Sequence, residues 1–363
     1  MKLALAISNH GNMLGGGEYS FLEFISRLKP NWRAVATVPF NGELAQRLRQ
    51  QGIETHTVAL PPIRPWRIAN IVSTLATYLR LGRSHRPALI YANGSRAALY
   101  GGFLGQLLKL PVIWHCRIAE RDPFADPLLI RLSNKIVVNS KATGNRFPPR
   151  IKDKVKVIYN GVDIEWLQHK SVKIPDLIHE DWKVILVVAR ASKWKRHDLI
   201  LALFELAASK DSAVHLVCIG ERDRSEPRWW SYLQEITHRS EYSDRIHWIG
   251  PVEDVRPWYR SSFVLVLASE NEPFGRVLVE AMATGVVVVA PMTGGIPEIV
   301  RSGRDGLLTP AGDVKEMANA VSRILKDESL RKRLAMSARD RVKLFDLDNQ
   351  VDKMIRTFEE APQ

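Results

Sequence analysis

Short apolar runs alternate with longer amphipathic stretches along most of the chain. The runs have the length of single β-strands, and the stretches between them repeat apolar residues at helical spacing. Strands separated by helices are typical of parallel α/β sheets. In the first half the pattern predicts helices such as 18–28 and 68–81, and strands at 3–7, 34–38, 54–58, 88–91, 112–114, 135–138 and 156–158.

A second series of the same kind starts at residue 183. It predicts helices alone from residue 314 on, and strands at 183–188, 214–219, 246–249, 263–268 and 286–290. The stretch before it, 170–181, contains Pro175 and little periodicity, which is typical of a linker.

The expected fold class is therefore α/β, with two Rossmann-like, doubly wound parallel-sheet domains. Carboxyl ends of such sheets are where ligands bind, so two domains side by side would face one central cleft. The predicted organisation is a domain at 1–169, a linker at 170–182, a second domain at 183–344, and a C-terminal helix at 345–363 that crosses back to the first domain.

Composition argues against a membrane-spanning helix and against disulfide bonds. The 363 residues are 45% hydrophobic and 25% charged, a globular balance that suits two domains. No apolar run reaches the roughly 20 residues that a membrane-spanning helix needs. The two cysteines, Cys116 and Cys218, fall within or beside apolar strands, and we expect buried free thiols in a reducing cytoplasm.

The net charge of +13 is placed unevenly along the chain. Residues 1–165 carry 23 Lys and Arg against 10 Asp and Glu, whereas residues 166–363 carry 29 of each. A basic first half favours an anionic partner such as a membrane face, a polyphosphate or a nucleic acid. A scattered basic surface that serves solubility is an equal alternative at this point.

One stretch of the second half combines two carboxylates with a helix start. Glu272 precedes a Pro-Phe-Gly turn, and Glu280 lies eight positions further along the helix that follows. The first backbone N–H groups of that helix, near Gly275 to Val277, lack intrahelical partners and carry the positive end of the helix dipole. This arrangement predicts an anion site with a carboxylate on either side. Two surface glutamates flanking an ordinary helix are the plainer alternative.

Other segments at predicted strand ends are candidates for the same ligand. The run 190–196 holds Arg190 and Lys195, whose side chains suit phosphate oxygens. Gly15-Gly16-Gly17 follows the first strand and lets backbone approach a ligand closely. His115 follows another predicted strand, and a lone histidine there is more often structural than catalytic.

The chain lacks the motifs of several other chemistries. It has no P-loop, no His-Glu-x-x-His, no Cys/His metal cluster and no G-x-G-x-x-G. We therefore expect neither a metal nor a nicotinamide cofactor.

Taken together, the motifs resemble the signature of retaining GT-B glycosyltransferases of family 4. The resemblance rests on Glu272-Pro273-Phe274-Gly275 with Glu280-Ala281-Met282-Ala283, and on Gly294-Gly295-Ile296-Pro297-Glu298. Arg190 and Lys195, Gly15-Gly16-Gly17-Glu18, and Asn160-Gly161-Val162-Asp163 resemble further family motifs, so that nearly the whole chain is covered.

The resemblance implies roles for the charged residues. Arg190 and Lys195 would bind the donor's diphosphate and stabilise the departing nucleoside diphosphate. Glu280 would hold the ribose hydroxyls, and Glu272 would contact the donor sugar. Charge developing on the leaving phosphate would be met by cations and a helix terminus, so that no metal is required.

The resemblance also implies backbone contacts. His115 would lie beside the donor sugar, Gly16 and Gly17 would close over the diphosphate, and Gly250 and Val252 would line the base pocket. Sugar hydroxyls and phosphate would meet the backbone of Phe274, Gly275, Arg276 and Val277.

Two positions depart from the family pattern. Arg196 stands where the family commonly has Gly, and it either adds charge near the phosphates or points outward. Cys116-Arg117 follows His115 where the family often has Asp or Gly, and we assign Arg117 to the acceptor site.

The expected function is transfer of a hexose from a nucleoside-diphosphate sugar, with UDP-glucose as the base-rate choice, to a glycan or lipid-linked acceptor of envelope or exopolysaccharide synthesis. The enzyme would be cytoplasmic, with the basic half facing an anionic membrane through segments 61–67 and 146–150, and would need no cofactor. A nucleotide-sugar epimerase of the same fold is the alternative. A non-enzymatic nucleic-acid binder would leave the two glutamates and the basic loop unexplained, so we expect no nucleic-acid partner.

Overall fold

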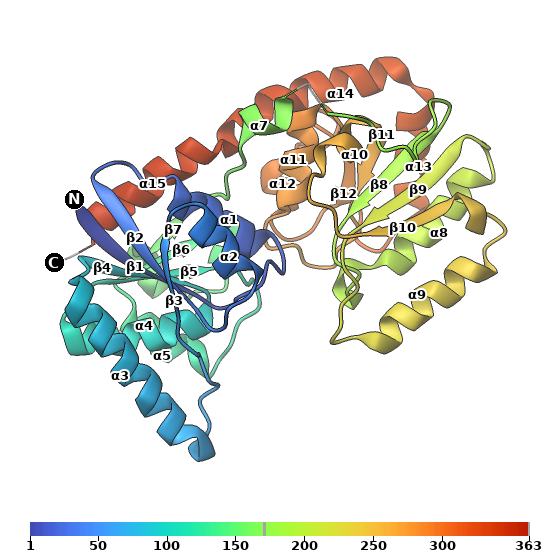
Figure 1. Ribbon diagram of the computed structural model, residues 1–363. Helices are drawn as coiled ribbons and strands as arrows, with labels where there is room; N and C mark the ends of the chain where they lie inside the picture. Colours follow the sequence, from blue (N-terminus) through green and yellow to red (C-terminus); the bar gives the residue numbers. More distant parts are fainter. Residues whose placement is uncertain (170–171, 362–363) are drawn as a thin grey trace. The chain divides into compact units, whose positions relative to one another are not determined.

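The computed structural model describes residues 1–169 and 172–361, which form two compact units (Figure 1). The first unit comprises Met1–Gly161 with Leu347–Gln363, and the second comprises Val162–Asp346. Each contains one parallel sheet with helices on both faces, as the strand pattern predicts.

The first unit holds a seven-stranded sheet in the order β3-β2-β1-β4-β5-β6-β7. Its elements are β1 (Lys2–Ser8), α1 (Gly16–Ser26), β2 (Trp32–Val38), α2 (Glu43–Gln50), β3 (Glu54–Thr57), η1 (Pro65–Arg67), α3 (Ile68–His85), β4 (Leu89–Asn93), α4 (Ser95–Leu108), β5 (Val112–Cys116), α5 (Ala125–Leu132), β6 (Lys135–Val138), α6 (Lys141–Gly144), η2 (Pro149–Lys154), β7 (Val155–Val157) and α15 (Leu347–Glu359).

The second unit holds a six-stranded sheet in the order β10-β9-β8-β11-β12-β13. Its elements are α7 (Ile164–Gln168), β8 (Lys183–Val188), η3 (Lys193–Lys195), α8 (His197–Ala208), β9 (Val214–Ile219), α9 (Pro227–Arg239), η4 (Ser243–Arg245), β10 (Ile246–Gly250), α10 (Arg256–Arg260), β11 (Ser262–Val266), α11 (Arg276–Thr284), β12 (Val287–Pro291), α12 (Ile296–Ile299), β13 (Leu307–Thr309), α13 (Val314–Lys326), α14 (Glu328–Arg341) and η5 (Val342–Phe345).

The central strands are buried on both faces, which explains why they read as continuous apolar runs. Every residue of β9 and β12 is buried, and helices of the same unit pack on the sheet. In both sheets the chain starts at the centre, builds outward to one side, and then returns to build the other side. The point where direction reverses lies between β1 and β4 in the first sheet and between β8 and β11 in the second.

The unit boundaries differ from the predicted ones. The second unit begins at Val162 rather than after a linker, because α7 packs on α11 and Gln168 donates to the carbonyl of Ala283. The guanidinium of Arg260 also donates to the carbonyl of Gln168 at 2.8 Å. Of the predicted linker, residues 170 and 171 lie outside the described residues.

The C-terminal helix α15 belongs to the first unit. Its Phe358 packs edge-on against Phe24 of α1 and Trp32 of β2, at centroid distances of 5.7 and 5.2 Å. Gln350 of the same helix accepts a hydrogen bond from the backbone N–H of Gly161. The last helix is therefore part of the core that covers one face of the first sheet.

Candidate functional site

The second sheet brings two loops together at its reversal point. Loops at the carboxyl ends of β8 and β11 are neighbours there, and ligands of doubly wound sheets bind in the crevice at that place. The loop after β8 carries Arg190 and Lys195, and the loop after β11 carries Glu272. Residues far apart in the sequence thus reach one site because of the strand order.

Lys195 and Glu272 form the centre of this site. The Nζ atom of Lys195 lies 2.6 Å from Oε2 of Glu272, and their side chains retain only 14% and 10% exposure. The same Nζ sits 3.9 Å from the ring centroid of Trp194, which adds a cation–π contact. A cation and a carboxylate are therefore held side by side with little access to water, where their charges act strongly.

A glycine pair fixes the backbone beneath Glu272. The N–H of Gly295 donates to the carbonyl of Glu272 at 2.8 Å. Gly294 has a φ of +55°, and a Cβ there would lie 2.2 Å from the same carbonyl oxygen. The Gly-Gly sequence at 294–295 thus permits a close backbone approach that positions the glutamate.

Arg190 lies on the same loop after β8 as Lys195, and its guanidinium is tethered to Asp223. Its Nε lies 3.3 Å from Oδ2 of Asp223, and its side chain is 35% exposed. Burial raises the pKa of Asp223, but hydrogen bonds from Ser225 and the charge of Arg190 outweigh this and lower it. Asp223 therefore remains ionised and orients Arg190.

Glu280 is held by two donors that the sequence pattern did not reveal. Arg276 donates from Nε to Oε1 at 2.7 Å, and the hydroxyl of Tyr259 donates to Oε2 at 2.9 Å. Tyr259 is fully buried, and burial together with the charge of Glu280 holds the pKa of its hydroxyl well above the usual range. Each carboxylate oxygen keeps a second lone pair for a further donor. A buried tyrosine in α10 looks like an ordinary core residue in the sequence.

The helix that follows the site begins at a glycine in the left-handed region. Gly275 has a φ of +98° and is the N-cap of α11, whose other end is closed by Gly285. Phe274 is buried against Phe345 and anchors this turn. The backbone of the first turn of α11, including Val277, therefore starts near Glu272 and can receive an anion.

Of the other residues named from the sequence, some lie at the same end of the sheet and one forms ion pairs with neighbouring carboxylates. Gly250 ends β10 and accepts a hydrogen bond from Gly220, and Val252 follows in the next loop. Arg196 pairs with Asp198 and Glu270 at 2.8 and 2.9 Å, so it adds no unpaired charge. Of the two alternatives for Arg196, outward ion pairing is the one that the structure supports.

The first unit places His115 at the end of β5 in a buried network. Its Nδ1 accepts from the hydroxyl of Tyr91 at 2.7 Å and faces Arg117 at 3.3 Å. Because an arginine only donates, Nδ1 carries no proton and Nε2 carries the N–H. That Nε2 is buried and has no partner among the described residues. Burial, followed by the charge of Arg117, holds the pKa of His115 well below its usual range, so the ring is neutral.

Arg117 supports this network rather than an open site. Its guanidinium donates to Asn93 at 2.8 Å and to Asn160 at 2.6 Å. A Cβ at Gly17, in the first turn of α1, would lie 3.3 Å from the Arg117 side chain. Gly16 and Gly17 therefore start α1 directly beside Arg117, which ties β4, β5 and the Asn160 turn together.

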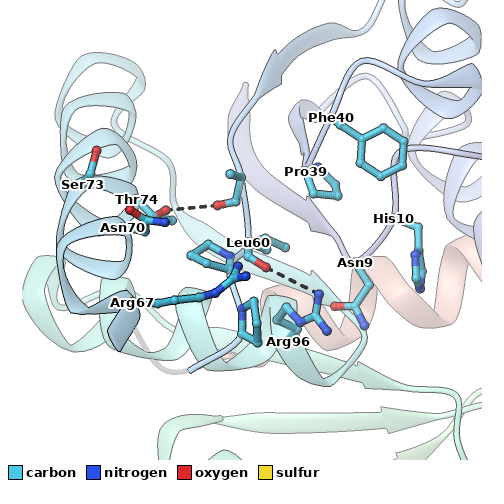
Figure 2. Close-up of a pocket in the computed structure, with 13 residues that line it drawn as sticks. Asn9, His10, Pro39, Phe40, Leu60, Arg67, Asn70, Ser73, Thr74 and Arg96 are labelled. Atoms are coloured by element: carbon cyan, nitrogen blue, oxygen red, sulfur yellow. Dashed lines mark hydrogen bonds between the residues drawn. The ribbon is translucent and has the colours of Figure 1, made fainter. Parts of the chain in front are cut away.

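A pocket of about 530 Å3 lies in the first unit (Figure 2). It is formed by the ends of β1 and β2, the loop after β3, and the starts of α3 and α4. The described residues that line it include two arginines and no carboxylate: Asn9, His10, Pro39, Phe40, Ala59, Leu60, Pro61, Pro62, Arg67, Asn70, Ser73, Thr74 and Arg96.

The positive charge of this pocket can be traced to the sequence, although the strand pattern did not reveal it. Residues 55–119 contain no Asp or Glu. Arg96 makes one long contact, 3.5 Å, with the carbonyl of Leu60, and Thr74 donates to the carbonyl of Ala59 (Figure 2). The pocket therefore presents positive charge next to prolines and Phe40.

Family models match the two units in turn. The model described as "Glycosyltransferase Family 4" matches residues 14–166, and the model described as "Glycosyl transferases group 1" matches residues 170–341. The chain belongs to the group 1, family 4 glycosyltransferases.

Curated relatives of this glycosyltransferase are distant and partial. N-acetyl-alpha-D-glucosaminyl L-malate synthase of Bacillus anthracis is 28% identical over 252 residues, which cover 66% of this chain and 64% of that protein. D-inositol 3-phosphate glycosyltransferase of Nocardioides sp. is 28% identical over 57% of this chain and 49% of that protein. The chain thus matches between about half and two thirds of the length of these relatives.

Solved structures match nearly the whole length of this glycosyltransferase. Anabaena Alr3699/HepE in complex with UDP and glucose superposes with a TM-score of 0.87, covering 98% of this chain and 99% of that one at 23% identity. The fold is GT-B, which confirms the predicted α/β class with two Rossmann-like parallel-sheet domains.

Two residues of segment 146–150, one of the two segments predicted to face a membrane, are not available for that contact. Arg146 is 8% exposed and forms an ion pair with the buried Asp126, whereas Pro149 and Arg150 are exposed. Phe147 is buried against Trp114. Segment 61–67 differs, since Trp66 is 73% exposed. Both cysteines are free and buried, as expected.

Proposed function

We propose that this glycosyltransferase moves a hexose from a nucleoside-diphosphate sugar to an acceptor, with retention of the anomeric configuration and without a metal or other cofactor. The observation that carries the proposal is the Lys195–Glu272 pair at the reversal point of the second sheet. Arg190 lies on the same loop as Lys195, and α11 starts shortly after Glu272. UDP-glucose is the first donor to test, because Alr3699/HepE structures contain UDP, glucose or UDP-glucose.

The chemistry of transfer accounts for these groups. When the bond to the nucleoside diphosphate breaks, negative charge grows on the phosphate and positive charge on the anomeric carbon. The negative charge is stabilised by Lys195, Arg190 and the amides of Gly275–Val277. The positive charge is stabilised by the carboxylate of Glu272. Glu280, oriented by Arg276 and Tyr259, is proposed to bind the ribose hydroxyls.

The remaining backbone and histidine contacts keep the roles that the family resemblance implies. The amides of Phe274 and Arg276 bind the sugar and phosphate, while Gly250 and Val252 flank the base. In the first unit, the Nε2–H of His115 is proposed to donate to a sugar hydroxyl, with Gly16 and Gly17 at the diphosphate.

A donor panel tests the proposal directly. Purified protein is given each of a set of nucleotide sugars, and release of the nucleoside diphosphate is followed with and without EDTA. We expect release from one donor, undiminished by EDTA, and a product anomer that matches the donor by NMR. Donor converted to its epimer without any acceptor would identify an epimerase instead. Absence of turnover with every donor and acceptor would refute the transferase proposal.

The acceptor is proposed to bind the pocket of Figure 2 through an anionic group. Arg67 and Arg96 provide the charge, and the names of two relatives include L-malate and D-inositol 3-phosphate, which are themselves anions. We expect Arg67→Gln and Arg96→Gln to raise the acceptor KM while leaving donor KM unchanged. Arg80→Gln on the exposed side of α3 is the matched control. An unchanged acceptor KM in both pocket variants would contradict the assignment.

The start of α3 is proposed to contact an anionic membrane that carries a lipid-linked glycan acceptor of envelope or exopolysaccharide synthesis. Ile63, Trp66, Ile68 and Val72 are 52–73% exposed, and Arg64 stacks over Trp66. Among residues 1–169 and 172–361 we find no helix suited to crossing a bilayer. Flotation with vesicles should require anionic lipid and should weaken in Trp66→Ser. Equal flotation with neutral vesicles would remove the electrostatic part of this proposal.

A further inference from the structure

A cluster of two histidines and one glutamate lies in the first unit, at the edge strand of its sheet. Glu54 and His56 occupy alternate positions of β3, so their side chains share one face of the strand. His85 is the last residue of α3 and reaches the same place. One oxygen, Oε1 of Glu54, lies 2.9 Å from Nε2 of His56 and 2.8 Å from Nε2 of His85.

The tautomer of His85 leaves its Nε2 atom with a lone pair that can bind a metal ion. Its Nδ1 lies 3.0 Å from the backbone carbonyl of Leu81, which can only accept, so Nδ1 carries a proton. In the neutral ring, Nε2 then turns its lone pair toward the carboxylate oxygen of Glu54, which also only accepts. Two lone pairs at 2.8 Å repel unless a positive species lies between them. A histidine whose outer N–H is bound to a backbone carbonyl is the usual arrangement of a metal ligand.

We propose that Glu54, His56 and His85 bind one divalent transition-metal ion, with Zn2+ as the first candidate. Their three ligand atoms all lie within 4.8 Å of one another. Zinc bonds of about 2.0–2.2 Å to nitrogen and oxygen place tetrahedral ligands about 3.3 Å apart. The exposures of the Glu54, His56 and His85 side chains are 51%, 35% and 16%, so small movements suffice to reach that spacing.

The donor set selects the metal. Imidazole nitrogen suits zinc, copper, nickel and iron, whereas magnesium and calcium prefer sites made of oxygen alone. The remaining coordination positions face solvent and would hold water. The segment 55–119, which contains both histidines of the cluster, has no Asp or Glu, so it supplies no further carboxylate. Affinity must therefore come from direct coordination rather than from a negative field.

In the first unit, the proposed metal ion would link β3 to the C-terminal end of α3. The other end of that helix carries Arg67, Asn70, Ser73 and Thr74 of the pocket. Helix α3 contributes few fully buried residues, namely Thr74, Tyr78 and Gly82, so its position depends on such peripheral contacts. A bound metal would hold the helix, and with it one wall of the pocket, against the sheet edge.

Calorimetry with ZnCl2 tests the proposal on tag-free, EDTA-stripped, full-length protein. We expect one ion bound per chain, and a visible absorption band when Co2+ replaces Zn2+. His56→Gln and His85→Gln should each remove the binding, and Glu54→Gln should weaken it at least tenfold. His238→Gln, an exposed histidine on α9, is the matched control and should bind as the original protein does.

Two outcomes would overturn the inference. One is the absence of stoichiometric binding to the original protein, which would mean that a proton on His85 bridges the cluster. The other is zinc binding that survives in both histidine variants. Circular dichroism and thermal unfolding should show that each variant is folded. We expect this because the three replaced side chains are partly exposed to solvent. Sugar transfer is measured separately, because the proposed reaction uses residues outside this cluster and should persist after EDTA treatment.

Discussion

Replacing Lys195 with methionine removes a charge while keeping most of the side-chain volume beside Trp194. Glu272, whose side chain is only 10% exposed, is then left without the cation with which it pairs. Breaking a buried pair by removing one member costs 3–5 kcal/mol. Because both side chains retain some exposure, we expect about 3 kcal/mol for Lys195→Met, at the lower end of that range.

The corresponding shift in thermal unfolding is large enough to measure. A unit of this size loses about 2–4 °C of Tm per kcal/mol, so the second unit should unfold about 6–12 °C lower. The double variant Lys195→Met/Glu272→Gln removes both charges and should recover most of the loss. In transfer assays, Lys195→Met should lower kcat by about 100- to 1000-fold, as loss of one stabilising donor does.

An exposed ion pair provides the control for the stability effect. Lys332 and Glu328 lie one helical turn apart, with side chains 73% and 63% exposed. Lys332→Met should therefore cost less than about 1 kcal/mol. If Lys195→Met costs no more than Lys332→Met, or if the double variant loses as much as both single variants together, the argument from a buried and coupled pair is wrong.

Three further predictions concern neighbouring positions. Gly294→Ala forces a Cβ against the carbonyl of Glu272 and should abolish most transfer while UDP binding, measured by calorimetry, falls less; wild-type turnover would contradict the positioning role. Tyr259→Phe leaves Glu280 with one donor fewer and should raise the donor KM roughly 10- to 150-fold, from the roughly 1.5–3 kcal/mol of a charged hydrogen bond, with kcat nearly unchanged. Burial, then the charge of Lys195, lowers the pKa of His197 from 6.5 to about 4, so stability is complete above pH 6.5 and declines as pH falls toward 4. His197 thereby contributes a loss of about 2 kcal/mol in unfolding free energy between pH 6.5 and pH 5. Denaturant titrations of His197→Phe should lack this contribution, so that its unfolding free energy depends less on pH. An unchanged pH dependence would refute the prediction.

The fold was largely predictable because the strands of a covered parallel sheet are continuous apolar runs. The runs at 135–138, 183–188 and 214–219 became β6, β8 and β9 with the same bounds. β13 was missed because Leu307–Thr309 is three residues long and leaves too little pattern to recognise. The boundary at Val162 was missed because α7 is a five-residue helix whose assignment depends on contacts with distant residues of α11.

The candidate site was predictable in its residue types but not in its pairings. The sequence singled out Lys195 and Glu272 and assigned them separate partners, the diphosphate and the sugar. Their direct contact spans 77 positions and results from the strand order, which no local pattern contains. Tyr259 and Asp223 were missed for a related reason. Each acts through a side chain that it orients, and an orienting residue has no spacing of its own in the sequence.

The place of α15 has a consequence for synthesis of the chain. The first unit needs Phe358 and its neighbours to cover Phe24 and Trp32, yet a ribosome makes Val162–Asp346 in between. At roughly 5–20 residues per second, that interval lasts on the order of ten to forty seconds. An apolar face of the nascent first unit stays open to chaperones throughout it. The unit that is started first is therefore completed last, after all of the second unit has been synthesised.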